Sequence, residues 1–281
     1  MKNFYILTNM EKDPAFDFTR KVEDYIRSKG GVCTHQLPQD GVMNTACASL
    51  VPEGCECVIV LGGDGTLIQA ARDLASCKIP VFGVNIGTLG YLTDIDKEHC
   101  FLAIDLLFAD EYSIDERMIL EGEVYLGGAD RPVVSYALND IVIGRLGPLK
   151  VINFDVYVNG QFLINYPADG LVVSTPTGST AYNLSAGGPI ISPCADIIVM
   201  TPICPHILTT SSVVFEGSDE LEIRCTPSRS GQELRVATFD GSSEYHLKTG
   251  DRIVIRQSKR KAYFARTDKQ NFLQILRNRL S

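Results

Sequence analysis

A glycine-rich loop with a carboxylate at its centre is the part of the sequence best suited to chemistry. Gly62, Gly63, Asp64, Gly65 and Thr66 stand between an apolar run and a helical pattern. Glycines in such a loop let backbone N–H groups approach a phosphate, which the helix dipole also favours. Because a carboxylate repels phosphates, Asp64 indicates chemistry at the phosphate, whereas a loop that only binds phosphate would favour Lys. A tight turn with Asp64 as a helix cap is the alternative.

A long run of small and hydroxyl-bearing residues is the second such feature. It extends over 169–189 and reads DGLVVSTPTGSTAYNLSAGGP. Short side chains expose backbone donors and acceptors that can bind an adenine edge, and the ring of Tyr182 offers a stacking face. A Ser/Thr-rich surface loop is an equally good interpretation of the residue types alone.

Asn139 and Asp140 form a third candidate, at the start of the β-run ALNDIVI. Adjacent amide and carboxylate groups can bind a ribose diol, as acidic residues do in dinucleotide sites. Turn chemistry explains the pair equally well, so the two residues weigh little by themselves.

The elements that must position these residues begin with an alternation of strands and helices. Apolar runs predict strands at 3–7, 58–61 and 81–84. Helical patterns follow the glycine loop and cover roughly 97–108. The alternation is typical of a parallel, Rossmann-like α/β domain.

A further helix is predicted between the first strand and the glycine loop. Asp13 is its expected N-cap, Pro14 its first helical residue, and Gly30-Gly31 its end. Four apolar residues fall on one face of this helix, as a helix that packs on a sheet requires.

The chain after about residue 112 is rich in strand patterns. They lie at 120–126, 141–143, 151–158, 171–173, 213–215, 221–225 and 252–256. Asn159-Gly160 separates two of the apolar runs and predicts a hairpin. We therefore expect two domains: an α/β N-terminal domain over 1–115, to which a C-terminal helix at 266–281 returns, and a larger β-rich domain over 116–265.

Charge and composition limit the partners. The chain has 26 Lys and Arg against 34 Asp and Glu, a formal net charge of -8, so the overall balance does not favour nucleic acid. Apolar runs are far shorter than the roughly 18 residues that a membrane span needs. Nine cysteines with no secretory segment predict reduced thiols and a cytoplasmic protein. Any phosphate site must be built locally.

Together, the motifs resemble those of the NAD kinase family. The blocks are GGDGT at 62–66, LGYLTD at 89–94, ALNDIVI at 137–143 and DGLVVSTPTGSTAYNLSAGGPIISP at 169–193, in the family's order. The resemblance spans nearly the whole chain. GGDGT alone also occurs in diacylglycerol kinases, sphingosine kinases and 6-phosphofructokinases, whereas the TPTGSTAY segment is highly specific.

The resemblance implies an enzyme that transfers the γ-phosphoryl group of ATP, or alternatively of polyphosphate, to the 2′-hydroxyl of the adenosine ribose of NAD. Asp64 would be the catalytic acceptor of the hydroxyl proton, at a site between the domains. Mg²⁺ or another divalent cation would be held through the phosphates, without a protein cage and with Asp64 as the candidate ligand. A lipid or sugar kinase with a GGDGT loop and a non-catalytic NAD-binding sensor are the alternatives.

Apart from Lys150, all residues to which the resemblance assigns a role lie in the four blocks. Those expected at phosphates are Gly62, Gly63, Gly65 and Thr66. Those expected at NAD are Asp64, Gly65, Tyr91, Asn139, Asp140, Lys150, Asp169, Thr180, Ala181, Tyr182, Asn183, Leu184 and Ser185. A homodimer or homotetramer is also implied.

The sequence departs from the family at two positions. Many members carry a basic residue two positions before Asp169, where this chain has Pro167, and Lys150 is the candidate to compensate. Some relatives carry Gln where this chain has Ser242. A charged contact between position 167 and the dinucleotide is therefore not expected in this chain.

Overall fold

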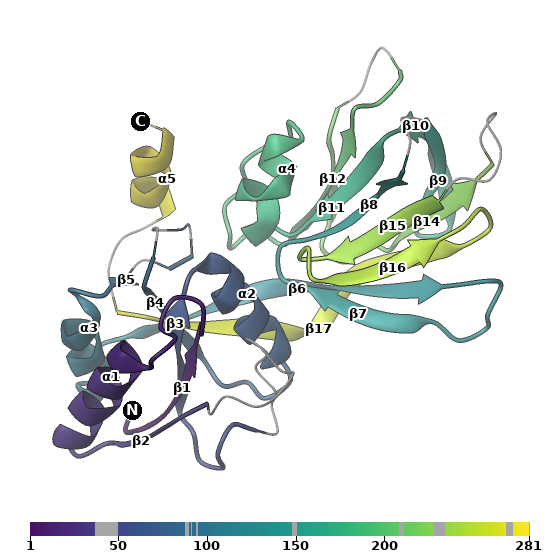
Figure 1. The fold of residues 1–281 in the computed structure, drawn as a ribbon. Coiled ribbons are helices and arrows are strands. Elements are labelled where there is room, and N and C mark those ends of the chain that lie inside the picture. Colours follow the sequence, from purple (N-terminus) through teal and green to yellow (C-terminus); the bar gives the residue numbers. More distant parts are fainter. Residues whose placement is uncertain are drawn as a thin grey trace. The chain divides into compact units, whose positions relative to one another are not determined.

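The structure is a computed structural model that describes residues 1–36, 50–87, 90, 92–93, 95–147, 151–207, 211–227, 234–267 and 272–280 (Figure 1). The chain forms two compact units, Met1–Arg117 with Lys261–Ser281, and Met118–Arg260. Two long strands, β6 (Ser113–Tyr125) and β17 (Arg252–Arg266), continue from one unit into the other.

The first unit is built on a parallel sheet. Its strands are β1 (Asn3–Thr8), β2 (Val32–His35), β3 (Cys57–Gly62), β4 (Val81–Asn85) and β5 (Ile95–Asp96). Their order is β2-β1-β3-β4, and β4 also pairs with β5 and with the end of β17. The helices are α1 (Asp17–Ser28), α2 (Asp64–Asp73) and α3 (Cys100–Phe108). The predicted parallel α/β layer is confirmed.

Helices cover both faces of this sheet, which explains why β3 is buried along its whole length. Ile59 on β3 shares a core with Val22 of α1 and Ile104 of α3. On β4, a Cβ atom on Gly83 would lie 2.7 Å from Leu67 of α2, so glycine at this position lets the helix approach. The glycine loop therefore follows the carboxyl end of β3, a strand that is buried between helices on both faces of the sheet.

The start of α1 differs from the prediction. The helix begins at Asp17, after Phe16 in a left-handed conformation (φ 57°), so Asp13 is not its N-cap and Pro14 is not its first residue. The carboxylate of Asp13 instead accepts hydrogen bonds from the N–H groups of Phe18 (3.3 Å) and Thr19 (2.9 Å). The carboxylate thus accepts hydrogen bonds from N–H groups in the first turn of α1, although a short loop separates Asp13 from the start of the helix.

The second unit consists of antiparallel strands. They are β7 (Val133–Ala137), β8 (Asp140–Leu146), β9 (Ile152–Val158), β10 (Gln161–Ala168), β11 (Gly170–Ser174), β12 (Ile197–Ile203), β13 (Val213–Glu216), β14 (Leu221–Thr226), β15 (Leu234–Phe239) and β16 (Ser243–Leu247). One sheet has the order β13-β12-β11-β8-β15-β16, and β10-β9-β14-β17 form the other layer. Side chains of both layers, among them Ile141, Val173, Phe154 and Ile255, share one core. The β-rich character predicted for this half is confirmed.

Two local features of this unit bear on the prediction. Asn159 (φ 50°) and Gly160 (φ 78°) form the left-handed turn between β9 and β10, so the predicted hairpin is confirmed. The strands β7, β12, β15 and β16 were not among the predicted ones. Two short helices, η2 (Thr177–Thr180) and α4 (Tyr182–Ser185), follow β11.

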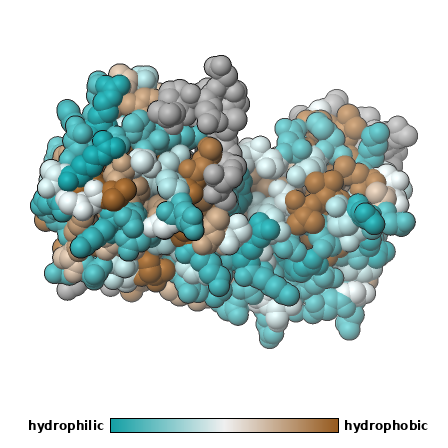
Figure 2. All heavy atoms as spheres, turned by 90° about the horizontal axis from the view of Figure 1, so that it is seen from below, coloured by the Kyte–Doolittle hydropathy of each residue, from teal (hydrophilic) through white to brown (hydrophobic). Residues whose placement is uncertain are grey.

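The last element is helix α5 (Phe272–Leu280), which lies within the range 266–281 predicted for a C-terminal helix, although Arg266 itself ends strand β17. Its return to the first unit stays a prediction. Within the described ranges, the helices are too short or too polar to cross a membrane. Figure 2 shows one face of the molecule, on which hydrophilic side chains predominate and apolar ones form separate patches.

The core of the second unit predicts a clear contrast between two phenylalanines. Phe154 on β9 is fully buried, whereas Phe162 on β10 is 57% exposed. Phe154→Ala should lower the free energy of unfolding by about 3–5 kcal/mol, because it removes buried apolar surface and leaves a cavity. Phe162→Ala should cost less than about 1 kcal/mol. Urea titrations measure both, and equal losses would contradict this view of the core.

Candidate active site

The glycine loop joins β3 to α2, and its glycines serve different purposes. A Cβ atom on Gly62 would lie 2.7 Å from the side chain of Thr66, so this glycine is required by packing within the protein. Thr66 is itself buried, and its Oγ1 accepts a hydrogen bond from Asn9 Nδ2 (3.0 Å). A Cβ atom on Gly65 would meet nothing within 4 Å. Packing therefore does not explain the glycine at position 65, whose outer face is open to a ligand.

Asp64 is the first residue of α2, and its carboxylate is held by two residues far along the chain. Oδ1 accepts hydrogen bonds from the backbone N–H (3.0 Å) and the hydroxyl (2.8 Å) of Thr93. The N–H of Leu92 donates to Oδ2 (3.2 Å). A Cβ atom on Gly90 would overlap the carboxylate, so only glycine fits beside it. These contacts fix the orientation of the side chain.

The hydroxyl of Thr93 is oriented in turn by Asn85, at the end of β4. Asn85 Nδ2 donates to Thr93 Oγ1 (3.0 Å), and Asn85 Oδ1 accepts a hydrogen bond from the N–H of Gly87 (2.7 Å). Asn85 lies opposite Gly62 in the parallel β3–β4 pair. Carboxyl ends of neighbouring parallel strands meet at one edge of a sheet, which brings these residues together.

Sequence reasoning missed Gly90, Leu92 and Thr93 although they belong to the LGYLTD block. Within that block it selected Tyr91, which lies outside the described residues. All four residues belong to a block that matches the family pattern, and that match was the signal that could have identified them. Thr93 is fully buried, so its contact with Asp64 depends on the folded sheet rather than on any local pattern.

In the second unit, Asp240 holds the Asn139–Asp140 pair. Its carboxylate accepts hydrogen bonds from the N–H groups of Leu138 (2.9 Å), Asn139 (2.7 Å) and Asp140 (3.3 Å). Asp240 has φ 49°, a conformation that aspartate adopts more readily than most residues.

The backbone of Asn139 also anchors the hydroxyl-rich segment. Its carbonyl oxygen accepts a hydrogen bond from the N–H of Thr175 (2.9 Å), and a Cβ atom on Gly178 would overlap it. Within the described residues, the side-chain amide of Asn139 makes no hydrogen bond, so both of its polar atoms can serve a ligand.

Burial makes Asp140 a weak acid. The side chain is only 5% exposed, and burial together with the carboxylate of Asp240 raises the pKa of Asp140 to about 7. A hydrogen bond from the N–H of Tyr182 opposes this rise. At neutral pH the carboxyl group can therefore donate as well as accept a hydrogen bond.

The hydroxyl groups of the TPTGSTAY segment are not all available to a ligand. Thr175 and Ser179 are fully buried, and their hydroxyls donate to the backbone oxygens of Leu138 (2.6 Å) and Pro176 (2.7 Å). Buried hydroxyls of this kind hold the segment in place. The expected NAD-contacting residues that remain accessible are Thr180, Ala181, Tyr182, Leu184 and Ser185.

Asn183 differs from its accessible neighbours. Its side chain is fully buried, and Nδ2 donates to the carbonyls of Ser179 (3.2 Å) and Pro189 (3.0 Å). Oδ1 accepts a hydrogen bond from Thr201 (2.7 Å). The side chain therefore holds the segment, and only the backbone of Asn183 remains for a ligand.

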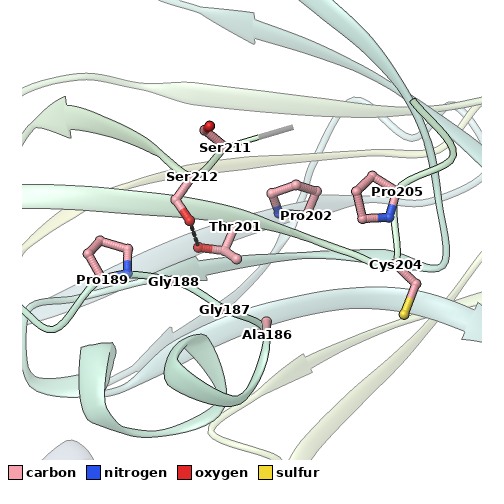
Figure 3. A pocket seen from close by; sticks show the side chains of 10 residues that line it. All are labelled: Ala186, Gly187, Gly188, Pro189, Thr201, Pro202, Cys204, Pro205, Ser211 and Ser212. Carbon is pink, nitrogen blue, oxygen red and sulfur yellow. Dashed lines mark hydrogen bonds between the residues drawn. The ribbon is translucent and has the colours of Figure 1, made fainter. Parts of the chain in front are cut away.

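A hollow of about 520 Å³ adjoins this segment (Figure 3). It is lined by residues 186–189, by Thr201 and Pro202 of β12, and by residues 204–205 and 211–212. Thr201, which holds Asn183, also forms a hydrogen bond with Ser212 (2.7 Å) on its wall. The hollow and the segment are thus joined by one hydrogen-bond network.

Asp169 lies apart from the other expected residues. Asp140 pairs with Ser174 across β8 and β11, whereas Gly144 pairs with Gly170 at the other end of the same strands. Four strand positions correspond to about 13 Å. Asp169 forms an ion pair with Arg145 Nε (3.1 Å). Lys150 lies outside the described residues.

Two family models match the chain: the ATP-NAD kinase N-terminal domain over residues 6–112 and the ATP-NAD kinase C-terminal domain over residues 138–267. An NAD kinase of Lachnospira eligens is 50% identical over 294 residues, covering 100% of both chains. An NAD kinase of Agathobacter rectalis is 42% identical over 283 residues, covering 100% of this chain and 99% of the relative.

Solved structures agree with these matches. Yeast NADH kinase complexed with NADH has a TM-score of 0.85 at 24% identity and covers 100% of this chain and 87% of that one. An NAD kinase from Archaeoglobus fulgidus in complex with ATP has a TM-score of 0.78 at 22% identity, covering 99% of each chain. The fold is therefore the two-unit fold of the NAD and NADH kinases. The chain belongs to the NAD kinase family of enzymes.

The raised pKa of Asp140 predicts a dependence of stability on pH. The folded-state pKa of about 7 lies above the ordinary value of 3.8, so the folded protein holds this proton more tightly and loses stability as pH rises between these values. In Asp140→Asn this loss disappears, and the variant gains about 2 kcal/mol relative to the parent between about pH 5 and pH 7.

Urea titrations of the ligand-free protein across this pH range measure the effect. Asp130→Asn is the matched control, because Asp130 lies in an exposed turn of the same unit. Its curve should run parallel to that of the parent. A parallel curve for Asp140→Asn as well would show that the carboxyl group is already ionised at low pH.

Proposed function

We propose that this protein transfers the γ-phosphoryl group of ATP to the 2′-hydroxyl of the adenosine ribose of NAD, giving NADP. The observation that supports this most strongly is the carboxylate of Asp64, held by Thr93 and Leu92 within the glycine loop. A fixed carboxylate beside phosphate-binding amides suits a reaction that must orient a hydroxyl and take its proton. In this reaction inorganic polyphosphate is the alternative donor.

In the proposed step, the 2′-oxygen forms a bond to the γ-phosphorus while the bond from that phosphorus to the β,γ-bridging oxygen breaks. ADP leaves with the electron pair of the broken bond, and the hydroxyl proton passes to Asp64. Phosphoryl transfer proceeds through a loose transition state, so orientation of the hydroxyl matters more than the strength of the base. The hydrogen bonds from Thr93 direct one carboxylate oxygen and leave the side chain a single orientation.

In this proposal, the first turn of α2 and the loop before it bind the phosphates. The free N–H groups at the start of a helix favour an anion, and the open face of Gly65 permits close approach. A magnesium ion fits this place, because Asp64 supplies a hard oxygen in the first helical turn and the donor phosphates supply the others. When bound, the ion neutralises charge on those phosphates.

In this proposal, NAD is bound by the cluster around Asn139 and Asp140 and by the accessible residues of the TPTGSTAY segment. The side chains of Asn139 and Asp140 bind ribose hydroxyls in this proposal, with the partly protonated Asp140 acting as donor or acceptor. Tyr182, 45% exposed, offers its ring for stacking. Contacts of Tyr91, Lys150 and Asp169 with the dinucleotide stay predictions.

Two further proposals are a homodimer or homotetramer, which the family resemblance implies, and a cytoplasmic location, which the nine cysteines favour. Light scattering after gel filtration measures the oligomer. Of the alternative functions, a non-catalytic sensor is disfavoured because Asp64 is present and held in one orientation. A lipid or sugar kinase with a GGDGT loop is disfavoured by the match of the second half of the chain to the NAD kinase C-terminal domain.

The role of Asp64 predicts a separation of binding from turnover. Asp64→Asn should fold and bind NAD but lose turnover by about 100-fold to 10,000-fold, the range of a general acid or base. Formation of NADP is followed with a dehydrogenase that accepts only NADP. Asp24→Asn, in an exposed position on α1, is the matched control and should keep its turnover. Turnover of Asp64→Asn near that of the parent would exclude the assigned role.

The exposed ring of Tyr182 predicts a loss of affinity for NAD. Tyr182→Ala should weaken binding by about fivefold, corresponding to about 1 kcal/mol of stacking, whereas Tyr182→Phe keeps the ring and should bind as the parent does. Titration calorimetry with NAD compares the three proteins. Unchanged affinity in Tyr182→Ala would count against stacking at this residue.

A further inference from the structure

A lysine amino group lies directly over the glycine loop. Lys12 Nζ is 2.8 Å from the position that a Cβ atom on Gly63 would take and 2.7 Å from the corresponding position on Gly87. Gly63 precedes α2, and Gly87 follows β4. The amino group therefore occupies space that two glycines leave open at the ends of adjacent parallel strands.

The loop that carries Lys12 is fastened to the glycine loop. The N–H of Lys12 donates to the carbonyl oxygen of Asn9 (3.1 Å), and the N–H of Asn9 donates to the carbonyl of Leu61 on β3 (2.8 Å). Asn9 Nδ2 donates to Thr66 in the first turn of α2 (3.0 Å). In Figure 1 this loop, drawn in purple after β1, lies beside the start of α2. The backbone of Lys12 is thus positioned by the same contacts that hold the glycine loop.

Among the described residues, the ammonium group of Lys12 has no ion-pair partner. In the part of the chain that the structure describes, no carboxylate lies within ion-pair distance of Lys12, whereas Lys29 pairs with Asp105 at 2.8 Å. The N-terminus of α2 carries a partial positive charge, which disfavours a nearby cation. An ammonium group held in this place is stabilised when a polyanion binds between it and the helix.

We propose that Lys12 contacts the substrate, and that its ammonium group binds the terminal phosphates of the nucleoside triphosphate. This inference rests on the function proposed above and adds a fixed cation to a phosphate site otherwise built from amides and a divalent ion. The chain has a net charge of -8, so a local cation at the loop has particular weight.

Calorimetric titration with magnesium-ATP tests the proposal on the whole chain. Lys12→Met should weaken ATP binding by at least about tenfold and leave NAD binding unchanged, and Lys12→Arg should restore most of the affinity. Lys21→Met is the matched control, because Lys21 lies exposed on α1 with no anionic partner among the described residues. It should bind ATP as the parent does.

The same proteins, assayed for NADP formation, separate this inference from the proposed function. In the assay, Lys12→Met should raise the KM for ATP and leave the KM for NAD unchanged. Equal ATP affinity and equal KM in Lys12→Met and the parent would overturn the inference, even if NADP forms normally. ATP binding that depends on Lys12, without any NADP formed by the parent, would uphold it and overturn the proposed function. Loss of affinity for both ligands in Lys12→Met, without recovery in Lys12→Arg, would assign the residue a structural role.

Discussion

Asp64 stands between two glycines, and residues far along the chain hold its side chain. Its orientation comes from Thr93 and Leu92, which reach it from beyond the next strand of the sheet. Thr93 in turn depends on Asn85, and Asn85 depends on the pairing of β4 with β3. The chemistry proposed for the loop thus depends on one hydrogen-bonded carboxylate, and that carboxylate depends on the parallel sheet. A loop excised from this sheet would keep its sequence and lose the geometry.

The second unit solves a similar problem in a different way. Asp140 starts the antiparallel strand β8, and Asn139 directly precedes it. Asp240 accepts hydrogen bonds from the N–H groups of both residues, while its charge also helps to raise the pKa of Asp140. One residue therefore sets both the backbone conformation and the protonation of the pair. The buried hydroxyls of Thr175 and Ser179 hold the TPTGSTAY segment in place through hydrogen bonds to backbone oxygens. Its accessible side chains are therefore not needed to hold it.

The sequence predicted the parts of the molecule that local patterns determine. An apolar run followed by glycines was enough to identify β3, the loop and α2, and Asn159-Gly160 was enough for the hairpin. The partners of Asp64 were beyond such reasoning, because a buried threonine far along the chain has no local pattern that marks it as a ligand of a carboxylate. Asp13 was recognised as a helix-starting residue but misplaced, since its carboxylate can serve the same N–H groups across a longer loop. The residue types of TPTGSTAY also could not show which hydroxyl groups are buried, because polar side chains that find backbone partners can be buried.

Phosphorus NMR of a reaction mixture containing the purified protein, NAD, ATP and magnesium tests the central claim most directly, because it identifies the atom that receives the phosphoryl group. The account predicts that the γ-phosphate signal of ATP decreases while the signal of a 2′-phosphomonoester on the adenosine ribose of the dinucleotide increases by an equal amount. Release of inorganic phosphate without a phosphorylated dinucleotide, or phosphorylation at another position, would contradict it.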